Sequence, residues 1–218
     1  MIAHFNIEQG TEEWYEIRHG KIGGTRSDAL FKDTETMLIE LLCELTEPFE
    51  MDYDSYESDD MVRGKMLESD AREAASRYVG VNFLQCGWLE SSECKLLGIS
   101  VDGITADFET TAEIKCPAAK KHMRTILSDE IPLDNIRQSL HYFTVNQTCR
   151  KHYFISFRPE SPKPLFVKML TRESVVNIGT KARPLMVTVE DAAKKGLERG
   201  LEIEKELQEK LLILNNNF

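Results

Sequence analysis

The sequence predicts one α/β domain that spans residues 1–218. A chain of 218 residues is long enough to bury one good hydrophobic core. Apolar residues recur at helical spacing in the N-terminal third and again near the C-terminus, whereas the middle of the chain has short apolar runs bounded by glycine and polar residues. Both patterns in one chain indicate helices packed around a sheet.

Helices are expected to lead the chain. Apolar spacing predicts them over residues 12–19, 34–45 and 59–78. Between the first two, Gly23 and Gly24 interrupt the pattern. Thr25, followed three residues later by Asp28, has the pattern of a capping box, which predicts that a further helix begins there.

An antiparallel meander is expected after Gly80. Its strands are predicted at VNFLQCGWLE, CKLLGISVDG, ITADFE and TAEIKCP, residues 81–90, 94–103, 104–109 and 111–117. A helix, then two strands joined by a proline-rich turn, are predicted over residues 133–146, 151–160 and 164–171. A last helix is predicted at about 189–214, and its apolar stripe suits packing on the domain better than an oligomer interface.

The cysteines and the hydropathy exclude several classes of protein. The five cysteines are an odd number and form no CxxC pair, so we expect reduced thiols rather than disulfides or a zinc ribbon. An iron–sulfur site built from distant cysteines is the weaker alternative. No apolar stretch approaches the roughly 20 residues that cross a bilayer, and no leader peptide is visible, so a cytoplasmic protein without a membrane partner is expected.

The charge limits how a nucleic acid could bind. A formal net charge of -10 argues against a partner held by overall electrostatic attraction, so any nucleic acid must be bound by a local basic surface. Much of the acidic excess lies in residues 47–60, which we expect to be a solvated loop.

Glu113, Ile114 and Lys115 form the most informative triplet. Side chains alternate between the faces of a strand, so Glu113 and Lys115 project to one side and Ile114 to the other. An exposed ion pair is the simplest explanation of such a triplet in isolation. However, Asp102 ends the preceding predicted strand at a turn with Gly103, and hairpin geometry would bring its carboxylate beside Glu113, giving two hard oxygen ligands of the kind that Mg²⁺ takes.

Glu68 is a third candidate carboxylate. It lies on the inward-facing stripe of the long helix predicted above, where a carboxylate is costly without a partner. A metal ion shared with Asp102 and Glu113 would supply that partner, and so would a buried salt bridge to Arg63 or Lys115. The residues alone leave both alternatives open.

Such a group of carboxylates suits phosphodiester hydrolysis. It would hold one or two Mg²⁺ ions, with two per site expected and Mn²⁺ as an alternative, which activate water and stabilise the attacking and leaving oxygens. Lys115 would orient or deprotonate the water, or neutralise charge on the phosphate.

Four motifs follow one another over roughly residues 8–145. They are EQGTEEWYEIRHGKIGGTRSD, GKMLESDA, the paired segments SVDG and EIKCP, and QSLHYFTV. Together they resemble the YqaJ-type viral recombinase group that contains bacteriophage lambda exonuclease, within the PD-(D/E)XK nuclease superfamily. A second glutamine that is frequent in the family is replaced by Leu140. The resemblance implies a restriction-endonuclease-like α/β fold, with a central mixed β-sheet flanked by helices.

The resemblance also implies roles for individual residues. The implied catalytic residues are Glu68, Asp102, Glu113, Lys115 and Gln138. The implied metal ligands are Glu68, Asp102, Glu113 and the backbone carbonyl of Ile114. Arg18 and Thr25 fall where the family contacts the DNA 5′-phosphate, and free N–H groups at the helix start predicted there would favour an anion, although a plain capped helix explains the same residues.

Basic residues after the catalytic strand are candidates for contacts with the DNA backbone. They are Lys120, Lys121, Arg124 and Arg137. A solvated helix face is the alternative explanation for those between 120 and 124.

The function implied is that of a Mg²⁺-dependent exonuclease. It would degrade linear duplex DNA from a 5′ end and expose 3′ single-stranded tails for recombination in a bacterial or phage-infected cell. The implied partners are duplex DNA ends, a single-strand annealing protein and further copies of the chain in a ring-shaped trimer. The alternatives are an endonuclease of the same superfamily and a non-catalytic subunit that binds DNA ends, although intact Asp102, Glu113 and Lys115 argue against the second.

Overall fold

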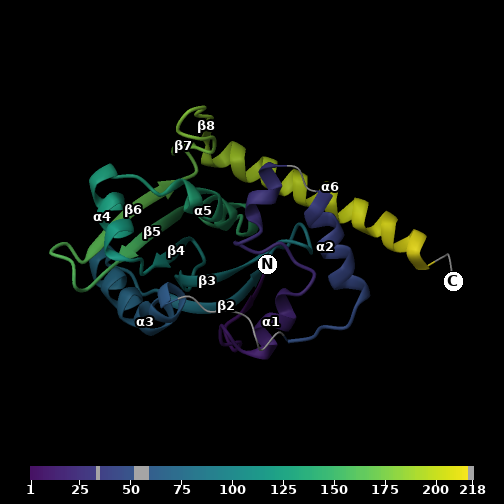
Figure 1. The fold of residues 1–218 in the computed structure, drawn as a ribbon, viewed down its shortest axis with the longest axis horizontal. Helices are drawn as coiled ribbons and strands as arrows, with labels where there is room; N and C mark the ends of the chain where they lie inside the picture. Colours follow the sequence, from purple (N-terminus) through teal and green to yellow (C-terminus); the bar gives the residue numbers. More distant parts are fainter. Residues whose placement is uncertain (33–34, 52–58, 216–218) are drawn as a thin grey trace.

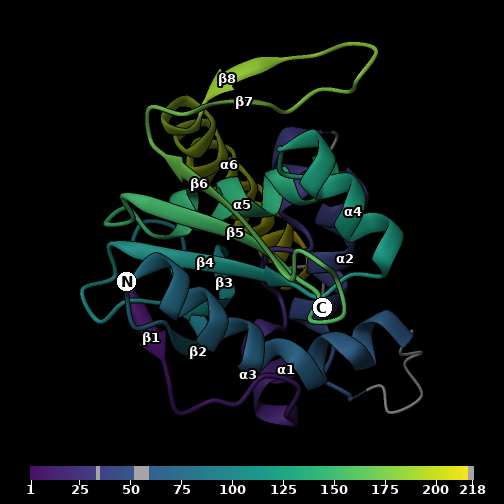
Figure 2. The ribbon, with the colours of Figure 1, turned by 90° about the vertical axis from the view of Figure 1, so that its left-hand side faces the viewer.

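A six-stranded mixed sheet lies at the centre of the computed structural model, which describes residues 1–32, 35–51 and 59–215. The strands are β1 (Ile2–His4), β2 (Leu84–Glu90), β3 (Gly98–Ile104), β4 (Thr110–Lys115), β5 (Lys151–Phe157) and β6 (Leu165–Thr171). They succeed one another across the sheet in chain order (Figure 2). All neighbours are antiparallel except β4 and β5, which run parallel with Glu113 opposite Phe154.

Helices cover both faces of this sheet. They are α1 (Glu12–Arg18), the 3₁₀ helix η1 (Ser27–Phe31), α2 (Glu35–Thr46), α3 (Asp59–Val79), α4 (Ala119–Ser128), α5 (Leu133–Val145) and α6 (Val189–Asn215). Helix α3 lies on one side of the sheet, and α5 and α6 lie on the other (Figure 1). A separate two-stranded ribbon, β7 (Val175–Asn177) with β8 (Met186–Thr188), precedes α6. The predicted mixed sheet flanked by helices is therefore confirmed.

The alternation of side chains along β5 explains why both faces are covered. Phe154 packs with α5 and α6, whereas Ile155 and Phe157 pack on the opposite face against α3. Ala71 and Ala75 are fully buried where α3 meets the sheet, and their small side chains let the helix approach closely. A strand with apolar residues facing both ways is typical of the interior of a sandwiched sheet.

The expected strand at residues 104–109 is wrong, because most of it forms the turn of the β3–β4 hairpin. The backbone N–H of Thr105 donates to the carbonyl of Thr110 at 2.9 Å. The Asp107 carboxylate accepts from the Thr105 hydroxyl and the Glu109 N–H, and Phe108 has a left-handed φ of 62°. The alternating polar and apolar residues in this turn imitate the pattern of a strand.

The capping box expected at Thr25 is also wrong. The helix that follows is a five-residue 3₁₀ helix that begins at Ser27, and Arg26 occupies its N-cap without a side-chain cap. Asp28 pairs instead with Lys32 and Arg137. A local pattern was overridden here by ion pairs, one of which reaches 109 residues along the chain.

Helix α6 confirms the prediction for 189–214 and packs on the domain. Two glycines allow its close approach: a Cβ at Gly196 would lie 2.9 Å from the Thr144 hydroxyl, and one at Gly200 would lie 2.8 Å from Leu97. Ile203, fully buried, belongs to the same contact. The last turns project beyond the body of the molecule (Figure 1).

Two further expectations concern the acidic run and membrane-spanning helices, and both can be compared with the described residues only. Residues 52–58, half of the acidic run 47–60, lie outside the described residues, so the expected loop is not tested there. Over the described part of the chain, no helix is both long and apolar enough to cross a membrane.

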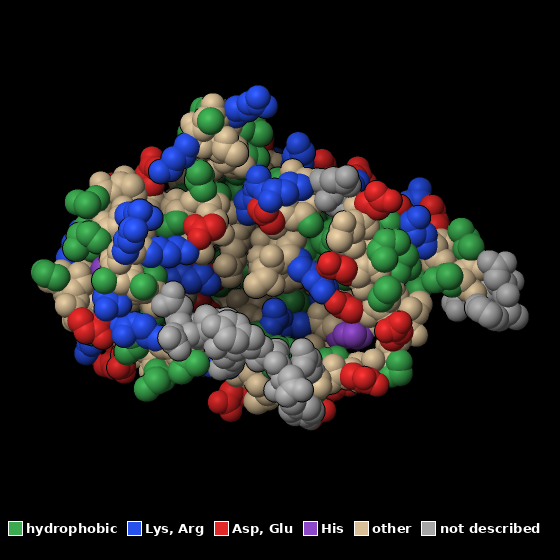
Figure 3. All heavy atoms as spheres, viewed as in Figure 1, with side chains coloured by type: hydrophobic (Ala, Val, Ile, Leu, Met, Phe, Trp, Pro, Cys, Tyr) green, Lys and Arg blue, Asp and Glu red, His purple; other side chains and the backbone are tan. Residues whose placement is uncertain are grey.

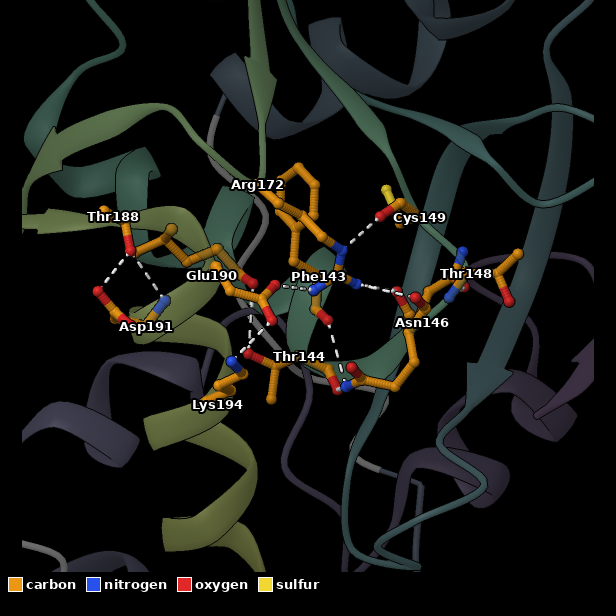
Figure 4. A network of polar contacts seen from close by, with 12 residues as sticks. Phe143, Thr144, Asn146, Thr148, Cys149, Arg172, Thr188, Glu190, Asp191 and Lys194 are labelled. Carbon is orange, nitrogen blue, oxygen red and sulfur yellow. Dashed lines mark hydrogen bonds and ion pairs between the residues drawn. The ribbon is translucent and has the colours of Figure 1, made fainter.

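Arg172, at the end of β6, joins the ends of three elements (Figure 4). Its guanidinium donates to the carbonyls of Asn146 and Gln147, which follow α5, and to the carbonyl of Cys149 at 3.0 Å. It also donates to Glu190 in the first turn of α6 at 2.6 Å. A single side chain therefore satisfies three carbonyls of the segment between α5 and β5 and ties that segment to α6.

Arg172→Met is expected to lower the free energy of unfolding by about 2–4 kcal/mol, because it leaves several carbonyls without a donor. Urea unfolding followed by circular dichroism would measure the change. Arg77→Met is the matched control, since Arg77 makes one exposed ion pair with Glu73 and should cost less than about 1 kcal/mol. Equal losses in the two variants would contradict the role of Arg172.

Candidate active site

Asp102 lies where β3 and β4 separate. The ladder between the two strands ends at the pair Gly103–Ala112, and beyond it the Asp102 carboxylate accepts the Ile114 N–H at 2.8 Å. The turn expected at Gly103 is wrong, because β3 continues to Ile104. The expected result nevertheless holds: a side chain replaces the missing backbone acceptor, which brings the Asp102 carboxylate beside Glu113.

Glu113 and Lys115 share a face of β4, as the alternation predicts. Their side chains form an ion pair, while Ile114 packs with α3 on the other face. Only 2% of the Glu113 side chain is exposed, against 36% of Lys115, so the ion pair runs from the interior toward solvent. The second oxygen of Glu113 accepts the Tyr142 hydroxyl at 2.6 Å.

Glu68 enters the site from α3. Its Oε1 atom accepts from Arg72 at 3.0 Å and from Gln85 at 2.8 Å. Arg72 also donates to the backbone carbonyl of Asp102 at 2.9 Å, which links α3 to β3. The partner of Glu68 is thus Arg72, one turn along the helix, and neither of the two cations that the sequence suggested.

The electrostatics of the site show an excess of negative charge. Burial, followed by repulsion from Glu113 and Glu68, raises the pKa of Asp102 well above its ordinary value. Burial opposes the charged form of Lys115, but the Glu113 and Asp102 carboxylates outweigh it and raise the pKa of Lys115 above its ordinary value. Three carboxylates face two cations, Lys115 and Arg72, so an added cation would relieve repulsion.

The donor set fits a magnesium ion held in part by water. Asp102 and Glu113 offer hard carboxylate oxygens, and the raised pKa of Asp102 marks a negative charge that lacks full compensation. Within the described ranges, no three His, Cys, Asp or Glu side chains are grouped so as to hold a metal ion alone. Mg²⁺ commonly takes one or two carboxylates and fills its octahedron with water and substrate phosphate oxygens.

Gln138 lies on α5, one turn before Tyr142, and lines a groove of about 580 Å³ together with Gly24 and Thr25. Its side chain packs on Gly24, where a Cβ would lie 3.1 Å from the Gln138 amide nitrogen. The resemblance implies that Gln138 acts at the reacting phosphate, and this stays a prediction; the structure places its side chain against the segment before η1.

Arg18 and Thr25 line a second pocket, of about 290 Å³. The Arg18 guanidinium lies 3.8 Å from the ring centre of Trp14, and burial lowers its pKa. No carboxylate of the described residues pairs with it. The indole N–H of Trp14 donates to the Gly87 carbonyl and to the Ser100 hydroxyl, two residues before Asp102. The helix that follows, η1, is a five-residue 3₁₀ helix that begins at Ser27, and it does not form the anion site expected at a helix start. The predicted phosphate site therefore depends on basic side chains such as that of Arg18.

The basic side chains predicted to contact DNA differ in their exposure and in whether they already pair with groups of the protein. Lys120, Lys121 and Arg124 are exposed on α4, and Lys121 pairs with Asp134. Arg137 pairs with Asp28 and donates to the Ile178 carbonyl at 2.8 Å, so it contributes to the packing of α5. Figure 3 shows Lys and Arg side chains gathered on the side of the molecule where α4 lies.

Three polar partners of the carboxylates were not predicted from the sequence: Arg72, Gln85 and Tyr142. Arg72 stands four residues after Glu68, a spacing that indicates an ion pair on a helix. Tyr142 lies within the QSLHYFTV motif, but the motif does not say which residue it contacts. Gln85 has no local signal, because its contact depends on how α3 crosses β2.

Fold and site together define the class of the molecule. Two acidic residues and a lysine where two strands of a mixed sheet separate are the arrangement of the PD-(D/E)XK-like fold. The chain belongs to the YqaJ-like viral recombinase domain family, whose model matches residues 13–149.

Solved structures support the same fold. The chain is similar to an alkaline exonuclease (LHK-Exo) from Laribacter hongkongensis, with a TM-score of 0.71 and 22% identity over 95% of this chain and 100% of that chain. The same exonuclease in complex with dAMP matches with a TM-score of 0.70, 22% identity and the same coverage. No curated protein matches significantly.

Proposed function

We propose that the protein is a Mg²⁺-dependent exonuclease that degrades linear duplex DNA from the 5′ end and leaves 3′ single-stranded tails for recombination. The observation that carries the proposal is the Asp102 carboxylate inserted between β3 and β4 beside the Glu113–Lys115 pair. Membership of a viral recombinase family and a fold shared with an alkaline exonuclease support it.

The residues of the site divide the work of hydrolysis. A bound Mg²⁺ would supply activation of water and stabilisation of charge on the phosphate oxygens. Asp102, Glu113 and the Ile114 carbonyl would hold it, with Glu68 oriented by Arg72. Lys115 reaches from Glu113 toward solvent, where its ammonium group can donate to the attacking water or to a phosphate oxygen.

The polarity rests on the Arg18 pocket. Among the described residues no carboxylate pairs with the Arg18 guanidinium, and the Trp14 ring supports it, which leaves its donors available to a phosphate. A 5′-phosphate bound there would be held by a segment that is anchored to β3 through Trp14 and Ser100. Gln138, in the neighbouring groove, would contact the strand between this pocket and the carboxylates.

The decisive experiment compares DNA ends. The purified protein is incubated in Mg²⁺ and in EDTA with linear duplex that carries a 5′-phosphate or a 5′-hydroxyl, and with the same DNA as a closed circle. We expect loss of the phosphorylated linear DNA only, in Mg²⁺ only, with nucleotides released from the 5′-labelled strand and a 3′ single strand left behind.

Other outcomes identify the alternatives. Cleavage of the circle would favour an endonuclease, and end binding without hydrolysis would favour a non-catalytic subunit. Release of nucleotides from 3′ ends would overturn the proposed polarity. The ring-shaped trimer and the single-strand annealing partner are part of the same proposal, and light scattering of the purified chain would test the trimer.

A further inference from the structure

Tyr142 contacts the Glu113 carboxylate from α5. The tyrosine lies on α5 and is fully buried, and its hydroxyl lies 2.6 Å from Oε2 of Glu113. The same hydroxyl is 3.3 Å from the Ser100 carbonyl, a longer contact. Its ring packs against His152, with ring centres 4.3 Å apart and ring planes tilted by 33°, so the side chain has little freedom to move.

The hydroxyl and Lys115 bind different oxygens of the same carboxylate. Lys115 contacts Oε1 of Glu113 and Tyr142 contacts Oε2, so each oxygen has one donor. A carboxylate held at both oxygens keeps one rotamer, and each oxygen retains a lone pair for a further partner. Of the two donors, only the tyrosine belongs to the rigid core, because Lys115 is partly exposed.

We propose that Tyr142 is a positioning residue that holds the Glu113 carboxylate in the orientation from which it binds a divalent cation. The inference rests on the proposed function, since it assumes that Glu113 is a metal ligand. Hydrogen bonds to metal-binding side chains fix their geometry, and their loss typically weakens metal binding about 10–100-fold.

Tyr142→Phe tests the inference with the smallest change. It removes the hydroxyl and keeps the ring on His152, so the fold is expected to persist, which circular dichroism checks. Mn²⁺ binding to the full chain without DNA, followed by electron paramagnetic resonance of the free ion, should weaken about 10-fold. In nuclease assays at subsaturating Mn²⁺ kcat should fall while KM for DNA stays unchanged.

Tyr153→Phe is the matched control. Tyr153 lies on β5, and its ring contacts Phe83 on the α3 side of the sheet. This substitution should leave Mn²⁺ affinity unchanged. If Tyr142→Phe binds Mn²⁺ as tightly as the unmodified protein does, the positioning role is wrong.

A Glu113→Gln variant separates this failure from failure of the proposed function. If the unmodified protein does not bind Mn²⁺, or if Glu113→Gln binds it equally well, the metal site itself is wrong. In the double variant, Tyr142→Phe should cause no further loss beyond that of Glu113→Gln. Should Tyr142→Phe fail to fold, 3-fluorotyrosine at position 142 keeps the hydroxyl but makes it a stronger donor; an unchanged Mn²⁺ affinity would then overturn the inference.

Discussion

Glu113→Gln is expected to abolish DNA hydrolysis, with kcat reduced about 10³-fold or more and little change in stability. The amide keeps the shape of the side chain, and its oxygen still accepts from Tyr142 or Lys115. It removes the charge that would hold the metal. Repulsion with Asp102 is removed as well, which offsets the lost ion pair with Lys115 and is the reason to expect a folded protein.

The measurement is release of nucleotides from linear duplex under single-turnover conditions, with thermal unfolding of the same samples. Glu109→Gln is the control, because Glu109 stands four residues earlier, is partly exposed and pairs with Arg150 on the surface. That variant should digest DNA at the rate of the unmodified protein. Activity of Glu113→Gln within about 10-fold of the unmodified protein would remove Glu113 from the catalytic group.

The strand β4 and the face that its charged residues share could be predicted because the information for them is local. Alternation along Glu113, Ile114 and Lys115 depends only on neighbouring residues, and the structure has both charged side chains on one face. The helical periodicity of α3 is also local information. It predicted that Glu68 faces the sheet, and in the structure Glu68 lies close enough to Asp102 to raise the pKa of that residue. Periodicity is a reliable guide to which face a residue occupies.

Partners could not be predicted in the same way, because they depend on tertiary contacts. The contact of Gln85 with Glu68 requires the register of β2 beneath α3, and that of Tyr142 with Glu113 requires α5 to cross the opposite face. The misplaced turn after Asp102 has the same origin. Where a strand separates from its neighbour is decided by what fills the gap, here the carboxylate itself.

Two buried histidines make stability depend on pH. His141 donates from Nε2 to the carbonyls of Ile22 and Gly98, and Nδ1 of His152 contacts the Thr111 hydroxyl. Within the described part of the chain, Nδ1 of His141 and Nε2 of His152 have no hydrogen-bond partner. Burial lowers the pKa of His141 to about 4 and that of His152 to about 3. Neither imidazole therefore has, among the described residues, an acceptor for a second N–H group.

The sign follows from these two pKa values. Below about pH 6.5 these two histidines take up protons in the unfolded chain but not in the folded chain. Their contribution to the free energy of unfolding is therefore fully present above about pH 6.5 and decreases as the pH is lowered. The loss continues to about pH 4 for His141 and to about pH 3 for His152. Each histidine costs ~1.4 kcal/mol per pH unit, or roughly 5 kcal/mol together at pH 4.5, which is comparable to the whole stability of many domains.

His152→Phe should reduce the pH dependence by ~1.4 kcal/mol per unit between about pH 6 and 4.5, whatever it does to stability at pH 8. Urea unfolding at each pH measures it. Asp102, with its raised pKa, acts in the opposite direction, but it is present in both proteins and cancels in the comparison. Phe154→Leu, a buried change on the same strand, should lower stability equally at every pH. If the free energy of unfolding of His152→Phe and of the unmodified protein depended on pH in the same way, a neutral, acid-sensitive His152 would be contradicted. A shallower pH dependence in His152→Phe would show that protonation of His152, which packs against Tyr142 of α5, contributes to acid unfolding.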